Sequence, residues 1–276
     1  MEVNRNVLLP SLLTICNGAC GFVALATLSK APVDDPVPAL ATASWLVFLG
    51  MVFDVFDGKV ARFSGGSSAL GAQLDSLCDL VTFGLVPAFM VMQLGRSPSP
   101  NWEKVVMVFS LAYFLGATLR LARFTAENSP DESAHLAFKG LPTPAAAGCV
   151  ASLVIFYCYI SASTKPELQW LKERWELEES FAFVVALIPT ALPFLVLFLG
   201  FTMVNGRMVF DHAGSWFFGR KHSFDFFVCL IFGVVLAAVI PEVVLPVLFF
   251  GYLVYKPALL VLRRLTPQKE SERRVA

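Results

Sequence analysis

The chain has 276 residues, a formal net charge of zero, 57% hydrophobic residues and only 15% charged residues. Soluble globular domains carry about 25% charged residues, so the composition excludes an ordinary soluble protein and favours a membrane protein. The balanced charge offers no basic surface of the kind that binds nucleic acid, and no nucleic-acid partner is expected.

The apolar residues fall in long blocks, which predict an all-α fold: a polytopic membrane bundle of about eight transmembrane helices. The predicted segments are 8–28, 40–62, 69–94, 104–124, 143–163, 181–203, 225–240 and 243–262. They form one transmembrane domain over residues 1–262, and a basic tail follows over residues 263–276.

The first segment begins after Arg5 and resembles a signal peptide in its apolar run. Its length, the polar Asn17 within it and the segments that follow favour a retained helix instead. Thr14 and Asn17 are three residues apart and share a helix face. They either line a ligand pocket or form hydrogen bonds to neighbouring helices.

The second and third segments carry four carboxylates at their adjoining ends: Asp54 and Asp57, then Asp75 and Asp79. The spacings of three and four residues place each pair on one helix face. A carboxylate in a membrane helix costs at least ~2.5–3.5 kcal/mol, so intramembrane acids are functional candidates by default. Four together also repel one another unless they are protonated or bridged by cations.

If these two helix faces lie opposite each other, their carboxylates form a cluster of oxygen ligands. Such a cluster selects magnesium, manganese or calcium over zinc or copper. A pair of these ions is a known way to transfer phosphoryl groups. Gly58, Ala61 and Gly71 on the same faces leave room for a ligand, and Arg62 adds positive charge suited to phosphate. Close helix packing and a snorkelling arginine are the alternative explanations for these four residues.

Two later stretches carry further polar signals. Arg120 and Arg123 share a face at the end of the fourth segment, where they clamp a diphosphate, hold a carboxylate, or only reflect the charge bias of the topology. Gly140 and Pro142 open the fifth segment, and the free N–H groups of a helix start favour an anion. A plain helix start explains the same pattern. Residues 164–180 predict a short interfacial helix.

Lysine and arginine set the orientation, because positive residues gather on the cytoplasmic side. A cytoplasmic N-terminus places most of them in cytoplasmic connections. The sequence therefore predicts a multi-pass protein with both termini and the Asp cluster on the cytoplasmic side.

The pattern Asp54-x2-Asp57-Gly58-x2-Ala61-Arg62-x8-Gly71-x3-Asp75-x3-Asp79 resembles, residue for residue, the signature of the CDP-alcohol phosphatidyltransferase family. The resemblance implies that family's fold, a homodimer, and a site with two divalent ions, magnesium or manganese. It implies that Asp54, Asp57 and Asp75 are metal ligands. Asp79 becomes the last ligand, the general base, or both. It also assigns the nucleotide and phosphate contacts to Gly58, Ala61, Arg62 and Gly71.

Three further stretches resemble the membrane-type phosphatidylserine synthases of that family. They are residues 9–22, which include Thr14 and Asn17, residues 119–124, and residues 138–148. This second resemblance implies that residues 1–262 are a catalytic domain. The implied donor is CDP-diacylglycerol, the acceptor is L-serine, and the products are phosphatidylserine and CMP.

Several alternatives stay open at this point. Within the family, the acceptor could be glycerol 3-phosphate, inositol phosphate or choline, and an ether-lipid donor would make the enzyme an archaetidylserine synthase. A cation transporter belongs to another class and would need acids deeper in other segments. Segments 143–163, 181–203 and 243–262 contain no acid, which disfavours the transporter.

Overall fold

The computed structural model describes residues 5–64, 69–97, 99–127, 140–161, 178–205 and 236–265, and no strand occurs among them. The predicted all-α fold is confirmed. The elements are α1 (Arg5–Ser29), α2 (Val37–Ser64), α3 (Ala69–Asp79), the π-helical segment η1 (Leu80–Leu85), α4 (Val86–Leu94), α5 (Pro100–Glu127), α6 (Thr143–Ser161), α8 (Glu178–Val204) and α11 (Pro241–Leu265).

Six stretches of the described chain are long and apolar enough to cross a membrane. They coincide with the first six predicted segments, and α3, η1 and α4 together form the third of them. The predicted segment 225–240 and the predicted interfacial helix over 164–180 lie mostly outside the described residues. The last predicted segment forms α11, but its apolar part, Pro241–Tyr255, is shorter than the six spans. The count of eight is therefore approximate.

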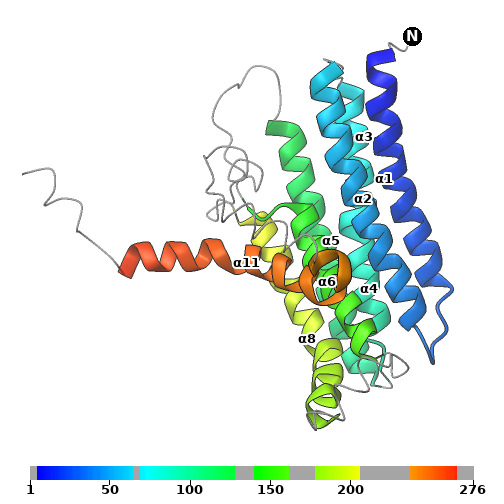
Figure 1. Ribbon diagram of the computed structural model, residues 1–276, viewed down its shortest axis with the longest axis vertical. Coiled ribbons are helices and arrows are strands. Elements are labelled where there is room, and N and C mark those ends of the chain that lie inside the picture. Colours follow the sequence, from blue (N-terminus) through cyan, green and yellow to red (C-terminus); the bar gives the residue numbers. More distant parts are fainter. Residues whose placement is uncertain are drawn as a thin grey trace, which may run out of the picture.

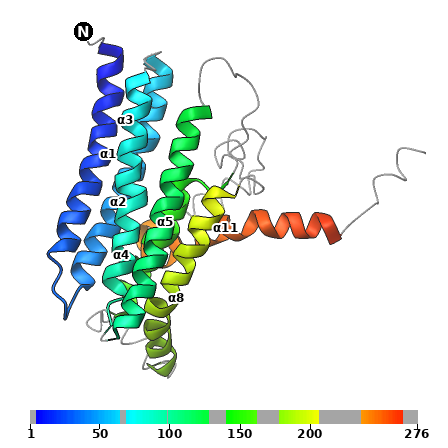
Figure 2. The same cartoon turned by 180° about the vertical axis from the view of Figure 1, so that it is seen from behind.

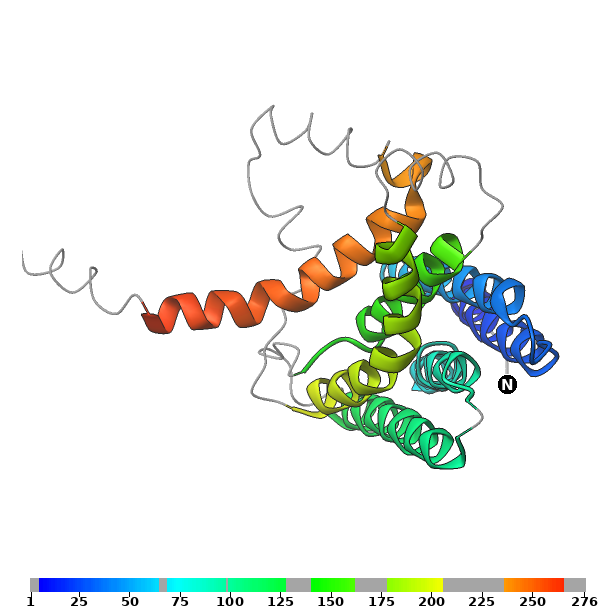
Figure 3. The same ribbon diagram turned by 90° about the horizontal axis from the view of Figure 1, so that it is seen from below.

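The spans run along one common direction, whereas α11 runs across it (Figures 1 and 2). Figure 3, seen from below, shows α11 leading away from the bundle toward its C-terminal end. The N-terminal end of α1 and the C-terminal ends of α2 and α5 lie at the same end of the bundle (Figure 1). This arrangement places the C-terminal half of α2 and the N-terminal half of the third span, which carry the acids, toward that end.

The centre of the bundle is α6, which is buried over most of its length. Its first turns carry the buried small residues Ala146, Ala147, Gly148 and Ala151. Small side chains allow neighbouring helices to approach closely, which is how helices associate in a membrane. α2, α8 and α11 all pack against α6.

Large apolar side chains also face outward from the bundle. Phe22, Phe183 and Phe201 are each about two-thirds exposed or more. Contiguous exposed apolar surface is rare on a soluble monomer and is expected where helices meet lipid. The chain is therefore an integral membrane protein, in agreement with its composition.

The connection into α6 has a fixed shape. Gly140 has a φ of 97°, in the left-handed region that favours glycine. A Cβ at this position would collide with the carbonyl oxygen of Met203. The next residue, Leu141, donates its N–H to the carbonyl of Thr202 at 3.2 Å. These contacts hold the start of α6 against the end of α8.

Candidate metal centre and adjoining cavity

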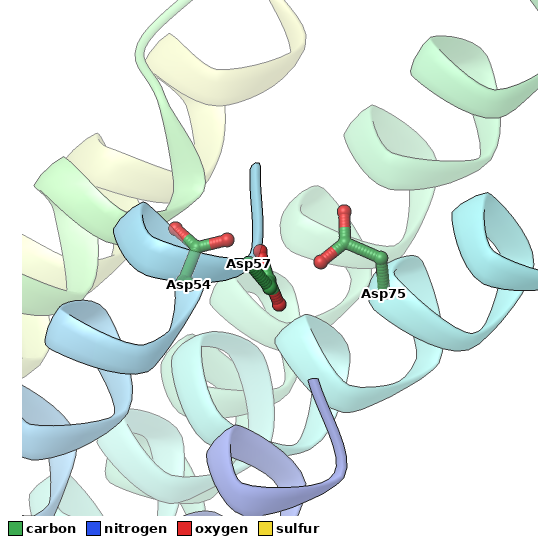
Figure 4. A group of neighbouring side chains, drawn as sticks. All are labelled: Asp54, Asp57 and Asp75. Atoms are coloured by element: carbon green, nitrogen blue, oxygen red, sulfur yellow. The ribbon is translucent and has the colours of Figure 1, made fainter. Parts of the chain in front are cut away.

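Three of the four predicted carboxylates converge. Asp54 and Asp57 project from α2 and Asp75 projects from α3, and one oxygen from each lies within 4.8 Å of the others. Figure 4 shows the three carboxylates gathered around one point between the two helices. Helical periodicity brings Asp54 and Asp57 to one face of α2, and the packing of α3 brings Asp75 to face them.

The fourth carboxylate, Asp79, ends α3 and is held by the first helix. Asn17 donates from Nδ2 to Asp79 Oδ1 at 2.8 Å. One turn away on α1, Thr14 donates from Oγ1 to Asp57 Oδ2, also at 2.8 Å. Asp57 and Asp79 are only 5% and 7% exposed, so these bonds satisfy carboxylates that water reaches poorly. Of the two roles that the sequence left open for Thr14 and Asn17, the structure shows bonding between helices.

A π-helical segment begins directly after Asp79. It runs over Leu80–Leu85, and its widened turn interrupts the regular helix between α3 and α4. Thr82 donates from Oγ1 to the carbonyl of Asn17 at 2.9 Å, and the buried Tyr113 hydroxyl donates to the carbonyl of Phe83 at 2.9 Å. π-helical turns are rare and occur often at functional sites. Here the segment ties the helix that carries Asp79 to α1 and to α5.

The carboxylate cluster fits a hard divalent cation. Asp75 Oδ1 is buried and has no hydrogen-bond partner among the described residues. A buried charged oxygen without a partner is costly, and a cation between the three carboxylates would satisfy it. An all-oxygen ligand set suits magnesium, manganese or calcium. The residues present therefore fit the divalent metal that the sequence predicted.

A cavity of about 690 Å³ adjoins the cluster. Its polar wall includes Asp54, Asp75, Asp79, Ser76 and Arg120. The rest of the wall is mostly apolar and comes from α2, α5, the start of α6 and α11: Met51, Val55, Leu121, Phe124, Pro142, Thr143, Pro144, Ala145, Leu248, Phe249 and Tyr252. A cavity whose wall combines acids, a guanidinium and many apolar side chains suits a ligand with a charged head and an apolar body.

The other predicted site residues lie at different places. Pro142 and Arg120 are in the cavity wall, and Gly140 lies beside Arg120, whose Nη1 is 3.3 Å from the position of a Cβ on Gly140. Among the described residues, Gly58, Ala61, Arg62, Gly71 and Arg123 do not contribute to that wall. A Cβ on Gly58 would meet no described atom within 4 Å, so space for a ligand exists there.

Sequence reasoning missed part of the cavity wall. Ser76 and Thr143 are ordinary polar residues in apolar helices, and Leu248, Phe249 and Tyr252 belong to a segment without any motif. The position of Ser76, one residue after Asp75, was a weak signal for its part in the site. Nothing local in the sequence indicated the contribution of α11.

The profile of the family described as CDP-alcohol phosphatidyltransferase matches residues 7–175. Three relatives carry the name CDP-diacylglycerol–serine O-phosphatidyltransferase. The protein from Saccharomyces cerevisiae is 33% identical over 159 residues, which cover 56% of this chain and 55% of the yeast protein. The one from Bacillus subtilis is 32% identical over 149 residues, covering 54% of this chain and 76% of that protein. The one from Helicobacter pylori is 30% identical over 169 residues, which cover 60% of this chain and 66% of that protein.

The chain thus spans about half the length of the yeast relative and two-thirds to three-quarters of the two bacterial ones. The matched region contains all four acids, the helices that carry them, and the two α1 residues that bond to them. The match covers more than half of this chain. On this evidence, and with the carboxylates gathered as the motif requires, the chain belongs to the CDP-alcohol phosphatidyltransferase family.

Proposed function

We propose that this protein transfers the phosphatidyl group of CDP-diacylglycerol to the hydroxyl of L-serine, giving phosphatidylserine and CMP. The observation that carries the proposal is the convergence of Asp54, Asp57 and Asp75 beside a largely apolar cavity within a membrane bundle. The names of the relatives support the donor and the acceptor.

Asp54, Asp57, Asp75 and Asp79 are the residues that would hold the divalent ions, and we propose two ions, magnesium or manganese. When bound, such ions polarise phosphate oxygens and neutralise the charge that develops on phosphorus and on the leaving phosphate. We assign the cytidine and diphosphate contacts to Gly58, Ala61, Arg62 and Gly71 because they occupy the positions of the family motif. The open space at the Cβ position of Gly58 supports its part in them. Arg123 acts on Arg120 with like charge, so the two guanidinium groups lie near each other.

In the proposed reaction, the serine hydroxyl oxygen forms a bond to the lipid-side phosphorus while the bond from that phosphorus to the CMP oxygen breaks. The hydroxyl proton goes to Asp79. Asn17 holds Asp79 Oδ1, which leaves Oδ2 to accept the proton. Asp79 faces the cavity, so the proton acceptor and the acceptor alcohol share one space. A covalent phosphatidyl-enzyme intermediate is not expected, because no motif position is a cysteine, a serine or a histidine that could form one.

The apolar cavity wall favours a lipid donor over a soluble nucleotide alone. Met51, Val55, Leu121 and Phe124 stand beside the acids, where the glycerol and first acyl carbons of a CDP-linked lipid would lie. The transporter alternative predicts further acids along an ion path. In the described part of the spans, the only other acids, Glu103 and Glu179, lie in the first turns of α5 and α8. A phosphatidyltransferase accounts for the arrangement better.

The decisive experiment incubates the purified full-length protein with labelled CDP-diacylglycerol, manganese or magnesium, and one acceptor at a time. Serine-dependent release of CMP together with labelled phosphatidylserine is the expected result. Turnover with glycerol 3-phosphate, inositol phosphate or choline in place of serine would overturn the acceptor, and a preference for an ether-lipid donor would point to archaetidylserine. Cation flux in liposomes without CMP release would instead favour a transporter.

Three finer proposals accompany this function. We propose that both termini and the acids face the cytoplasm, with residues 1–262 as the catalytic domain and 263–276 as a basic tail, and that the protein is a homodimer. The charge bias of the connections supports the orientation. Labelling of single cysteines placed at Lys30 and at Phe63 tests it, because Lys30 lies in the connection between α1 and α2 and Phe63 lies near the C-terminal end of α2. Equal access to both from one side would contradict the orientation. Sedimentation of the detergent-solubilised protein tests the dimer.

A further inference from the structure

α11 lies outside the region that matches the family, yet it is docked firmly on α6. The ring of Phe249 occupies the space in which a side chain at Gly148 would stand. The same ring packs against Phe48 of α2 with a centroid separation of 5.7 Å. Cys149 places its thiol 3.6 Å from the carbonyl of Phe249, to which it donates. These contacts set the position of α11 against the mouth of the cavity.

The docking turns one face of α11 into the cavity. Leu248, Phe249 and Tyr252 line the cavity and lie within one helical turn of each other. Val247 and Tyr255 are 67% and 54% exposed and take no part in the wall. The contribution of α11 to the cavity is therefore confined to a defined set of side chains, which a mutation can test separately from the rest of the helix.

Tyr252 is the polar member of this set, and it faces Arg120 of α5. The two side chains line the same cavity, one from α11 and the other from α5. A phenol hydroxyl can accept a hydrogen bond from a guanidinium, which cannot lose its proton and always needs acceptors. Arg123 also acts on Arg120, with like charge. Tyr252 therefore offers the Arg120 guanidinium an acceptor from the α11 side of the cavity.

The cavity wall that includes Arg120 also contains a buried hydroxyl without a hydrogen-bond partner among the described residues. Thr143 begins α6, is 1% exposed, and its Oγ1 has no hydrogen-bond partner among the described residues. Thr143 and Arg120 both line the cavity, and α6 presents its N-terminal end there. The Thr143 hydroxyl, the Arg120 guanidinium and the N-terminal end of α6 all favour a carboxylate or a phosphate as ligand. The four acids repel a bare anion, so Arg120 and Thr143 form the part of the cavity wall that suits an anionic group.

We propose that Tyr252 is a positioning residue that holds Arg120 for the carboxylate of the acceptor amino acid, so that α11 sets the acceptor selectivity of the enzyme. This inference rests on the proposed function. It assigns Arg120 and Thr143 to the acceptor end of the cavity and leaves the acids to the diphosphate of the donor. The hydroxyl of the same acceptor then points toward Asp79.

The test uses the full-length protein in mixed micelles and compares Tyr252→Phe with the matched control Tyr255→Phe. Both variants keep an aromatic ring, and each loses one hydroxyl on the same helix. For Tyr252→Phe, the KM for serine should rise roughly tenfold or more, the effect of losing a hydrogen bond to a charged group. The KM for CDP-diacylglycerol and the rate at saturating serine should stay near wild type, and Tyr255→Phe should match wild type throughout.

A second measurement separates positioning from general damage. Wild type should prefer serine to ethanolamine, which lacks the carboxylate, and Tyr252→Phe should reduce that preference. An unchanged KM for serine in Tyr252→Phe, or a rise in the KM for CDP-diacylglycerol alone, would overturn the inference while leaving the proposed function intact. Absence of serine-dependent CMP release in the wild type would instead overturn the proposed function, and this inference with it.

Discussion

Asn17 of α1 and Asp79 of α3 are joined by a 2.8 Å hydrogen bond between residues 62 positions apart in the sequence. The bond fixes one carboxylate oxygen of the last acid of the motif. The backbone carbonyl of Asn17 also accepts a hydrogen bond from Thr82, so α1 contacts the chain on both sides of the start of the π-helical segment. The first helix therefore supports the site although it carries no acid of its own.

This bond predicts a catalytic defect in Asn17→Ala. Loss of a hydrogen bond to a charged group costs ~1.5–3 kcal/mol, so kcat should fall roughly tenfold to a hundredfold. Metal affinity should change little, because Asp54, Asp57 and Asp75 keep their geometry. CMP release and manganese titration measure the two effects. Thr27→Ala, at the other end of α1 with a hydrogen bond only to its own helix, is the control. An equal loss of activity in Asn17→Ala and Thr27→Ala would contradict the role assigned to Asn17.

Asp75 is expected to be essential. Asp75→Asn removes one of the three converging carboxylates and should abolish turnover and weaken manganese binding, as followed by electron paramagnetic resonance. Asp34→Asn, in the exposed connection before α2, makes the same chemical change away from the site and should behave as wild type. Near-normal activity in Asp75→Asn would refute its role as a ligand.

Removal of divalent ions should destabilise the protein. Three carboxylate oxygens within 4.8 Å repel one another unless a cation lies between them. A bound ion at roughly 100 times its Kd stabilises a fold by ~2.7 kcal/mol. Thermal unfolding in detergent should therefore show a higher Tm with manganese or magnesium than with a chelator. In Asp75→Asn the Tm should depend much less on the ion. Equal dependence in both proteins would place the stabilising ion elsewhere.

Two glycine-to-alanine substitutions should change the thermal stability of the protein in opposite directions. Gly140→Ala forces alanine into a left-handed conformation, at ~1–2 kcal/mol, and into the carbonyl of Met203, so both Tm and activity should fall. Gly58→Ala meets open space in a helix, where alanine is favoured by ~0.5–1 kcal/mol, so its Tm should hold or rise. Its activity should nevertheless fall if the donor occupies that space. Full activity in Gly58→Ala would remove Gly58 from the proposed substrate contacts.

Much of the site could be predicted because its pattern is local. Asp54 and Asp57 are three residues apart, as helical periodicity requires for one face, and the short connection to α3 leaves few ways to place Asp75. The six spans follow from apolar length alone, because a membrane of fixed thickness demands a run of about 20 apolar residues. Neither inference needed knowledge of which helices are neighbours.

The sequence by itself thus determined an all-helical membrane protein with a carboxylate cluster on two adjoining helices, since charge, hydropathy and spacing are properties of short stretches. Only the tertiary structure decided that Thr14 and Asn17 hold Asp57 and Asp79, and that α11 runs across the bundle and brings Tyr252 to Arg120. These contacts join residues dozens to more than a hundred positions apart. They depend on how side-chain shapes such as Phe249 and the gap at Gly148 fit together, which no local pattern encodes.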